Sequence, residues 1–317
     1  MGRAAASPSL DWNGDNGRRW VENQDRLDRM LAAYGAALAR AAAPALGDHV
    51  LDVGCGAGAT TFDMAARVGP SGRVVGLDIS SPLIGRALDL AASQGGEAVE
   101  FRLADAALAD FTPDFDRIVS RFGVMFFDDP VAAFANLGRA LKPDGRLVFV
   151  CWRGAAENDW TRLPMAAIRD IAPAPAPADP EAPGPFAFGD RDRIARILID
   201  GGYADIDIRP FDSPVHFGVG DTADAALDDA VDHAIRVGPL ERALRGVSSS
   251  VRDQALAAVR LAFAGKLRSD GVWIDGAAWI VSARRVKARR RPSPGSDPSR
   301  RVRPGRAPAR RRPGRRG

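Results

Sequence analysis

Short apolar runs alternate with helical patterns through the middle of the chain, and this alternation restricts the possible folds most strongly. The runs are rich in Val, Ile and Leu and cover residues 49–53, 73–78, 99–105, 115–120 and 146–152. Such runs are typical of strands buried on both faces. The helical patterns between them cover about 58–69, 81–94 and 130–141. Because crossovers between parallel strands are right-handed, the sequence predicts a doubly wound α/β fold with helices on both faces of the sheet.

The segments on either side of this core are less regular. Residues 18–43 have the spacing of an amphipathic helix. After residue 152 we predict a helix at 158–171, an extended proline-rich linker at 173–185, a helix at 190–203, a strand at 204–211, two or three helices within 221–268, and a final strand at 271–284 interrupted by a glycine-rich turn or bulge.

The C-terminal end of the chain is strongly basic. Residues 284–317 hold fifteen of the 44 Lys and Arg residues and one of the 40 Asp and Glu residues, so the preceding 283 residues carry a formal charge of −10. This segment is rich in Arg, Pro and Gly, and we expect it to be disordered. The expected organisation is a helical cap at 1–47, a main domain at 48–284 with a helical insertion at about 221–268, and the tail at 285–317.

Cysteine content and hydropathy indicate a cytoplasmic protein. The two cysteines, Cys55 and Cys151, are too few for a disulfide framework and suit a reducing compartment as small buried side chains. The first ten residues, MGRAAASPSL, lack the apolar stretch of a signal peptide. No later run approaches the ~20 apolar residues that a membrane span needs. We therefore expect neither secretion nor membrane insertion.

The stretch VLDVGCGAGATT, residues 50–61, places a glycine loop between the first strand and the following helix. Gly54, Gly56 and Ala59 also fit the weak G-x-G-x-x-A pattern of dinucleotide-binding proteins. Asp78, at the end of the second strand, is placed to accept hydrogen bonds from ribose hydroxyls. Ribose recognition is common to both kinds of nucleotide cofactor, so these residues alone leave the choice open.

Asp52, which precedes the glycines, favours one of the two candidates. A dinucleotide places its pyrophosphate at this helix N-terminus, where a nearby carboxylate would repel it by roughly 1–4 kcal/mol. S-adenosylmethionine has no phosphate and carries an ammonium and a sulfonium group, which a carboxylate attracts. A position of Asp52 at the mouth of the pocket therefore favours S-adenosylmethionine, unless the side chain turns away to bond with backbone groups.

Further segments extend the match beyond the glycine loop. Five of them follow one another in the order and spacing of a known motif set: VLDVGCGAG, VVGLDIS, RLADAALADF, FDRIVSRFGVMFF and LKPDGRLVFVCW. In these motifs the chain resembles class I S-adenosylmethionine-dependent methyltransferases, over about residues 10–284. It looks closest to the small-molecule branch that includes ubiquinone and menaquinone methyltransferases, whose bacterial relatives have a cap similar to residues 12–31. The resemblance implies a seven-stranded, Rossmann-like sheet with an antiparallel last strand.

The resemblance also assigns roles to individual residues. Asp52, Gly54, Gly56 and Gly58 would hold the methionine end of S-adenosylmethionine. The adenosine end would contact Asp78, Ile79, Asp105 and Ala106. Arg121 and Phe122, just after the fourth strand, would face the substrate side, with Arg121 counted among the cofactor-binding residues. The remaining assignments are Trp20 and Gln24, which could close over the cofactor, and Phe126, which could line an aromatic acceptor pocket together with Phe122.

Methyl transfer from a sulfonium is an in-line displacement, so positioning and exclusion of water supply much of the acceleration. We expect a small organic acceptor, because the insertion at 221–268 could cover a compact pocket, and we expect no metal site. An oxygen or carbon acceptor needs a base, for which the histidines are His49, His216 and His233. His216 is the best placed of these, near the substrate side, whereas lone histidines are structural by default.

Three other functions fit parts of the sequence. A nucleic-acid methyltransferase could use the basic tail to neutralise phosphates, although SRFGVMFF lacks the Asn or Asp-Pro-Pro-aromatic arrangement of base amino-methyltransferases. The tail could instead fold back onto the acidic body or be a solvated extension, and we favour the last. The glycine pattern alone would fit an NAD-dependent oxidoreductase. A non-catalytic cofactor-binding module would keep the cofactor motifs without a base.

Overall fold

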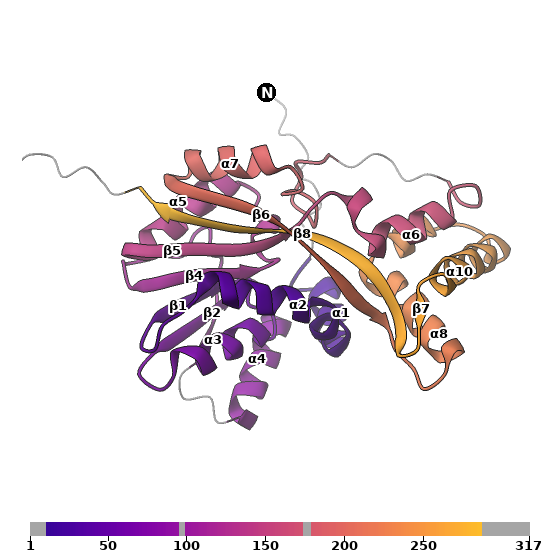
Figure 1. The fold of residues 1–317 in the computed structure, drawn as a ribbon, viewed down its shortest axis with the longest axis horizontal. Helices are drawn as coiled ribbons and strands as arrows, with labels where there is room; N and C mark the ends of the chain where they lie inside the picture. The colour runs from indigo at the N-terminus through magenta and orange to yellow at the C-terminus, as the bar shows by residue number, and fades with distance from the viewer. Residues whose placement is uncertain (1–10, 95–98, 174–178, 287–317) are drawn as a thin grey trace, which may run out of the picture. The chain divides into compact units, whose positions relative to one another are not determined.

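The computed structural model describes residues 11–94, 99–173 and 179–286, and Figure 1 shows a single sheet with helices on both faces. The first ten residues of the expected cap lie outside the described residues. So does the chain from residue 287 onward, which includes almost all of the basic tail, its expected disorder and its possible contact with nucleic acid. The last strand continues as far as Arg285.

The strand order of the sheet is β3-β2-β1-β4-β5-β8-β6. Strands β1 to β5 are parallel, β8 is antiparallel to both β5 and β6, and the short β7 pairs with β8. The strands are β1 (His49–Val53), β2 (Arg73–Asp78), β3 (Val99–Leu103), β4 (Phe115–Arg121), β5 (Leu141–Trp152), β6 (Tyr203–Gly218), β7 (Leu267–Arg268) and β8 (Gly271–Arg285). The predicted doubly wound, mostly parallel, Rossmann-like fold with an antiparallel last strand is confirmed.

Helices cover both faces of this sheet. Helices α2, α3 and α4 lie on one face and α5 and α7 on the other (Figure 1). The central strands are apolar because both faces are covered, and Val50, Val75 and Ile118 are fully buried. The helices are α1 (Asp15–Glu22), α2 (Gln24–Ala42), α3 (Ala59–Val68), α4 (Ser81–Gln94), η1 (Val124–Phe126), α5 (Pro130–Ala140), η2 (Ala155–Glu157), α6 (Asp159–Ala167), α7 (Arg191–Asp200), α8 (Ala223–Val237), α9 (Leu240–Ala243) and α10 (Ser249–Ala264).

The N-terminal region forms two helices where the sequence predicts one helix over 18–43. The break falls at Asn23, whose Nδ2 donates to the Arg19 carbonyl oxygen at 2.7 Å and whose Oδ1 accepts from Arg26 Nη1 at 3.3 Å. An Asn side chain competes in this way with the backbone bonds of a continuous helix. Helix α2 then buries its apolar face against the sheet, where Tyr34 and Leu38 are fully buried.

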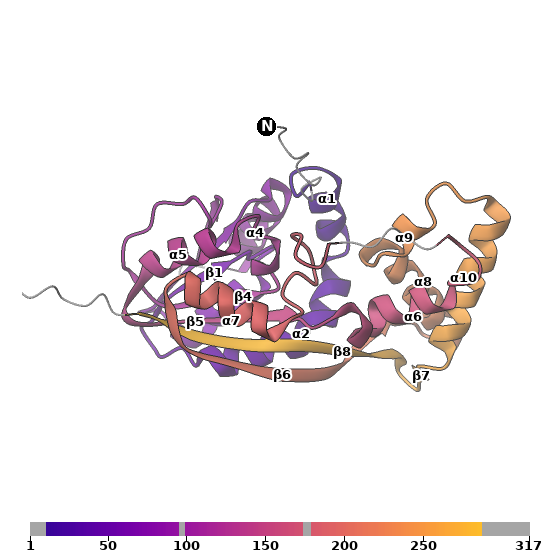
Figure 2. The ribbon, with the colours of Figure 1, turned by 90° about the horizontal axis from the view of Figure 1, so that it is seen from above.

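Strands β6 and β8 extend beyond the rest of the sheet as a long arm. Strand β8 pairs with β5 from Arg284 to Ala278 and continues to Gly271 against β6. Figure 2 shows α6, α8, α9 and α10 gathered at the end of this arm that lies farther from β5; we call these four helices the helical lobe. Helices α8 to α10 confirm the predicted helices within 221–268, and β6 is longer than the predicted 204–211.

The predicted interruption of the last strand is wrong, because β8 runs through Gly276 without a break. The glycine is needed for close packing: a Cβ atom at this position would lie 2.3 Å from the Tyr34 hydroxyl oxygen and 3.0 Å from Val215 Cγ2. Helix α2 can therefore lie directly on the arm at this position, through Tyr34.

We expect Gly276→Ala to lower the free energy of unfolding by about 1–2 kcal/mol, because the added methyl group overpacks the contact with Tyr34. Urea denaturation followed by circular dichroism measures this change. The control is Gly85→Ala on exposed α4, where a Cβ would meet nothing within 4 Å. Alanine there should raise the free energy of unfolding by about 0.5–1 kcal/mol. Equal stability of Gly276→Ala and wild type would contradict the packing argument.

Ion pairs join the lobe to the N-terminal helices. Arg26 of α2 donates to Asp229 at 2.7 Å and to Asp232 at 2.6 Å, both on α8. These ion pairs connect α2, which packs on the sheet, with the lobe. They also explain why residues 18–43 and 221–268, far apart in the sequence, belong to one structural unit.

The proline-rich segment differs from the extended linker predicted at 173–185. Residues 174–178 lie outside the described residues, and residues 180–188 form turns and bends. These turns bury Ala187 and Phe188 in the core, and Gly184 N donates to the Met125 carbonyl oxygen at 3.1 Å. The end of the segment and the residues just after it thus pack onto the domain.

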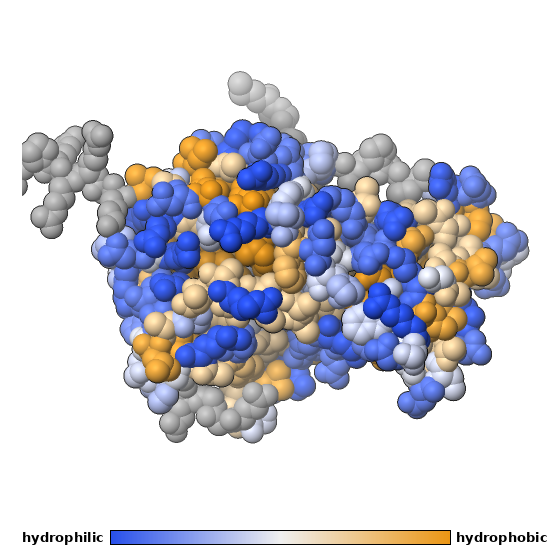
Figure 3. Space-filling model, viewed as in Figure 1, coloured by the Kyte–Doolittle hydropathy of each residue, from blue (hydrophilic) through white to orange (hydrophobic). Residues whose placement is uncertain are grey.

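The described surface is mixed in character. Figure 3 shows hydrophilic residues over most of one face, with smaller hydrophobic areas between them, including one in the region of α10. Leu261 of that helix is among the exposed large apolar residues. In the described ranges, no helix has both the length and the hydropathy of a membrane span.

Candidate active site

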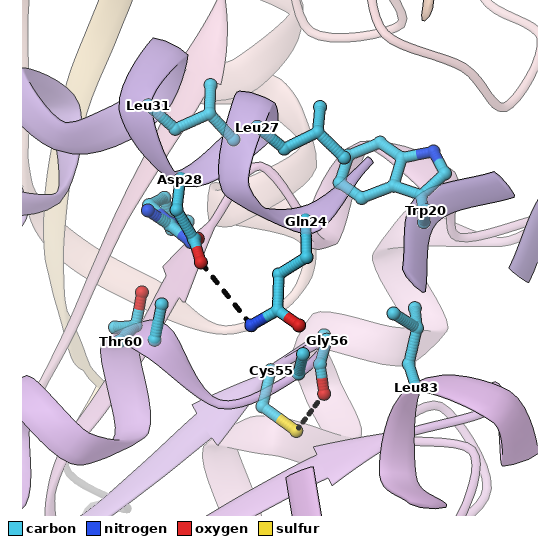
Figure 4. A pocket seen from close by; sticks show the side chains of 13 residues that line it. Trp20, Gln24, Leu27, Asp28, Leu31, Cys55, Gly56, Thr60 and Leu83 are labelled. Atoms are coloured by element: carbon cyan, nitrogen blue, oxygen red, sulfur yellow. Dashed lines mark hydrogen bonds and ion pairs between the residues drawn. The ribbon is translucent and has the colours of Figure 1, made fainter. Parts of the chain in front are cut away.

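A pocket lies between α1 and α2 on one side and the loop from β1 to α3 on the other. Figure 4 shows Gln24 and Asp28 of α2 facing Cys55, Gly56 and Thr60 across it. The lining residues are Trp20, Gln24, Leu27, Asp28, Leu31, Gly54, Cys55, Gly56, Ala57, Ala59, Thr60, Leu83 and Arg121.

The floor of the pocket is the glycine loop. Gly54 has φ +67° and Gly56 has φ +56°, a backbone region that side chains strain. A Cβ on Gly54 would also lie 2.7 Å from Gly123 Cα, so the loops after β1 and β4 approach each other here. A Cβ on Gly56 would meet nothing within 4 Å. Gly56 therefore leaves open space beside the backbone where a ligand can lie.

Asp78 fixes this loop from the end of β2. Its Oδ2 accepts from Gly56 N at 2.9 Å, and its Oδ1 accepts from Ser80 N at 2.9 Å. Burial raises the pKa of the Asp78 carboxyl, while the hydrogen bonds from Ser80 and Gly56 act to lower it. Each carboxylate oxygen has a further lone pair, so Asp78 can hold the loop and still accept hydrogen bonds from a ligand.

Asp52 differs from the expectation that it lies at the mouth of the pocket. Its side chain is 0% exposed and is not among the lining residues. Its Oδ2 accepts from Thr61 Oγ1 at 2.7 Å, and its buried Oδ1 has no partner among the described residues. Burial raises the pKa of Asp52 to about 7, against the hydrogen bond from Thr61 and the positive charge of Arg121, which lower it. A carboxyl group that is partly protonated at neutral pH attracts cations less than the sequence argument assumed.

Two charged side chains line the pocket instead. Arg121 Nη2, at the end of β4, pairs with Asp28 Oδ1 at 3.1 Å. The other oxygen of Asp28 faces Gln24 Nε2 at 3.4 Å, and Gln24 Oε1 accepts from Arg86 Nε of α4 at 3.1 Å. These contacts tie the cap to the strand end and to α4 around the pocket. The sequence predicted Arg121 and Gln24 as site residues but not Asp28.

Sequence comparisons agree with this geometry. A family model described as a methyltransferase domain matches residues 46–170. Over 132 residues the chain is 39% identical to nocamycin O-methyltransferase of Saccharothrix syringae, a match that covers 39% of this chain and 47% of that protein. In residues 46–170 the chain is therefore similar to methyltransferases, in agreement with the class I motifs in its sequence. Over 105 residues it is 33% identical to demethylmenaquinone methyltransferase of Lactococcus lactis, covering 33% of this chain and 42% of that protein.

The chain spans about half or less of the length of these two relatives. A solved structure, the YcgJ protein of Bacillus subtilis, is similar in fold with a TM-score of 0.53 at 19% sequence identity. That likeness covers 80% of this chain and 98% of the other, and it supports the Rossmann-like arrangement of the fold.

The two aromatic residues predicted for the acceptor side lie in separate clusters. Phe122 has φ +62°, donates from its backbone N to the Val150 carbonyl oxygen at 3.0 Å, and stacks on Trp152 with ring centroids 4.1 Å apart. Phe126 contacts Trp12 edge to face at 5.1 Å. Trp12 in turn contacts Trp20, which lines the pocket, at 5.6 Å. Both phenylalanines lie in the segment after β4, but neither is among the residues that line the pocket.

The residues predicted for the adenosine end of the cofactor lie at the ends of β2 and β3. Ile79 is 42% exposed, which is unusual for its size and leaves an apolar face free. Asp105 Oδ1 accepts from Ala107 N at 2.8 Å, and the Ala106 carbonyl oxygen accepts from Asn136 Nδ2 at 3.0 Å. These three residues and Asp78 lie at or just after the carboxyl ends of parallel strands, where ligands of doubly wound sheets bind.

None of the three histidines is among the residues that line the pocket in the described ranges of the chain. His216 lies within β6 rather than after it; its Nε2 is 2.9 Å from the Asp270 carbonyl oxygen and its ring stacks on Trp273. His49 faces Asp114 at 3.2 Å. Burial lowers the pKa of His233 to about 4, so this side chain is neutral at physiological pH.

The pocket thus brings together five of the predicted residues: Trp20, Gln24, Gly54, Gly56 and Arg121. Sequence reasoning missed Leu27, Asp28 and Leu31 of α2 and Leu83 of α4 as lining residues. A signal for Asp28 was present, because Gln24, Asp28 and Leu31 follow Trp20 at helical spacings of four, four and three. Two polar residues in an otherwise apolar face of a helix indicate that this face contacts something other than the hydrophobic core.

Proposed function

We propose that this chain transfers the methyl group of S-adenosylmethionine to a small organic acceptor. The observation that carries the proposal is the pocket between the glycine loop and the α1–α2 cap, next to Asp78 at the end of β2. When bound, S-adenosylmethionine supplies an electrophilic methyl group on a sulfonium. The chain then has to bind the cofactor, orient the acceptor and exclude water.

The residues present fit the adenosine end of the cofactor. Asp78 holds the loop with one lone pair of each oxygen and keeps the others for ribose hydroxyls. Ile79 offers an exposed apolar surface for one adenine face. We assign Asp105 and Ala106, after β3, to the adenine amine and ring. Because β2 and β3 are neighbours, these residues lie at the same edge of the sheet.

The methionine end is assigned to the glycine loop and the cap. Gly54 and Gly56 allow a ligand to approach the backbone, and Trp20 and Gln24 lie on the opposite wall. Gly58 is not a lining residue; it caps α3, and a Cβ there would lie 2.7 Å from Phe101 Cζ. Arg121 is the cation at the strand end. Asp52 acts, in this proposal, from below the loop through Thr61 rather than by direct charge attraction.

Small organic acceptors are supported by the surroundings of the pocket. Apolar side chains on the cap and α4 exclude water from it, which favours displacement at the methyl group. The two relatives are named for the small organic compounds nocamycin and demethylmenaquinone. We keep Phe122 and Phe126 as candidate acceptor contacts and His216 as a candidate base. We also place the protein in the cytoplasm, which suits the buried free thiols of Cys55 and Cys151.

Calorimetry on the full chain tests the proposal with S-adenosylmethionine, S-adenosylhomocysteine and NADH. We expect S-adenosylmethionine and S-adenosylhomocysteine to bind, and we expect no binding of NADH. A screen of small phenols, quinones and carboxylic acids with methyl-labelled S-adenosylmethionine should then show label in an organic product, with S-adenosylhomocysteine formed in equal amount. Binding of NADH without binding of either sulfur ligand would contradict the proposal.

A further inference from the structure

Charge is distributed in an unusual way around the pocket. Among the described residues that line it, Asp28 and Arg121 are the two that carry charge, and they pair with each other at 3.1 Å. The Arg121 side chain is 15% exposed and the Asp28 side chain 37%. The pocket therefore holds one anion and one cation side by side, beside the glycine loop.

The amino-acid end of S-adenosylmethionine carries the same two charges, an α-ammonium and an α-carboxylate. We propose that Asp28 accepts the α-ammonium and Arg121 donates to the α-carboxylate, in exchange for the ion pair that the two side chains make with each other. Asp28 then determines specificity, because it selects ligands that keep an intact amino-acid end. This inference rests on the proposed function.

The exchange is favourable for two reasons. A partly exposed ion pair contributes little to stability, so breaking it costs little. Leu27 and Leu31 flank Asp28 on α2 and also line the pocket, so a bound ammonium is shielded from water and its hydrogen bond to the carboxylate is strengthened. Each charge of the ligand meets an opposite charge, and no charge of the pocket is left alone.

Helix α2 presents Asp28 in a fixed position. The helix is anchored to the sheet by the buried Tyr34 and Leu38, and to α8 by Arg26. Gln24, one turn before Asp28, is held by Arg86 of α4. Because the carboxylate is already placed, little conformational entropy is lost when it binds an ammonium.

A purely structural role is the competing explanation, in which the pair only fastens α2 to the end of β4. Two ligands separate the roles. S-adenosylhomocysteine carries the amino-acid end, whereas 5′-methylthioadenosine has the same adenosine and sulfur but lacks both charges. A contact to the ammonium affects the first ligand alone, whereas a displaced helix affects both.

The test is calorimetry with both ligands on the full chain and on the Asp28→Asn variant. We expect S-adenosylhomocysteine to bind about 10- to 100-fold more weakly to the variant, the scale of a hydrogen bond to a charged group. The affinity for 5′-methylthioadenosine should stay within about twofold. Asp25→Asn is the matched control, because it removes the same charge from an exposed position on the same helix. Both ligands should bind it as they bind wild type.

Two results would overturn the inference while the proposed function stands: an equal loss for both ligands, or an unchanged affinity for S-adenosylhomocysteine in folded Asp28→Asn. Arg121→Gln provides a second variant, for which the same preference for loss of the charged ligand is expected. If wild type binds neither ligand, the proposed function itself fails, and that outcome is seen before any variant is compared.

Discussion

Replacing Asp78 with alanine is expected to weaken the binding of S-adenosylhomocysteine by about 1.5–3 kcal/mol, the scale of hydrogen bonds to a charged group. The variant loses the carboxylate that would accept the ribose hydroxyls. It also releases Gly56 N and Ser80 N, so the glycine loop loses the contact that holds it to β2. Isothermal titration calorimetry of the full chain measures the change.

Asp89→Ala is the control for this experiment, since Asp89 is an exposed acid on α4, which follows Asp78 in the chain. Its affinity for the ligand should equal that of wild type. Asp78→Asn separates the loss of the negative charge from the loss of the acceptor oxygens, because the amide keeps one acceptor oxygen but carries no charge. An unchanged affinity in a folded Asp78→Ala protein would remove Asp78 from the site.

Replacing Asp52 with asparagine is expected to make the protein more stable than wild type at pH 8 and to bring the two closer together at pH 4.5. Burial raises the pKa of Asp52 from its ordinary value of 3.8 to about 7. A raised pKa in an acid means that the folded state binds the proton more tightly than the unfolded state. The stabilisation from the protonated form is therefore present below about pH 4 and is lost as pH rises through 7.

Asparagine has nearly the same shape as aspartic acid and no charge to bury, so the stability of the Asp52→Asn protein lacks this dependence on pH. The rise in the pKa of Asp52 from 3.8 to about 7 corresponds to at most about 4 kcal/mol. This value is the upper limit for the change, between pH 4.5 and pH 8, in the stability difference between the two proteins. Urea denaturation of both proteins at pH 4.5 and pH 8 provides the four free energies. Asp63→Asn on α3, 42% exposed and paired with Arg67, is the control and should stay within about 0.5 kcal/mol of wild type. A difference between Asp52→Asn and wild type that does not grow with pH would contradict the argument.

The parallel part of the fold could be predicted from sequence because its signals are local. Short apolar runs identify β1 to β5, although β3, at the edge of the sheet, is only partly buried and not covered on both faces as predicted. The pattern at 81–94 gives the bounds of α4 as the structure has them. The failures depend on contacts made at a distance. Asn23 breaks the first helix through its own hydrogen bonds, and Gly276 continues a strand because Tyr34, far away in the chain, needs the space.

The site was predictable to a similar extent. Motif spacing identified the glycine loop, Asp78 and Arg121, because these positions follow directly from the ends of predicted strands. It could not show that Asp52 is buried beneath the loop, since a residue before a strand end can point to either face of the sheet. Asp28 was missed because its contact with Arg121 depends on how α2 lies across the sheet, which the helix pattern does not specify.

The arm of β6 and β8 divides the fold into two parts. The residues assigned to the cofactor lie on the parallel strands, the loops that follow them and the N-terminal helices, whereas α8, α9 and α10 connect to the parts of β6 and β8 that extend beyond the pairing with β5 at Ala278. Among the described residues, none between Val219 and Asp270 lines the pocket. This stretch can therefore vary in sequence, in evolution or by design, while the pairing of β1 to β5 and the residues of the pocket stay the same.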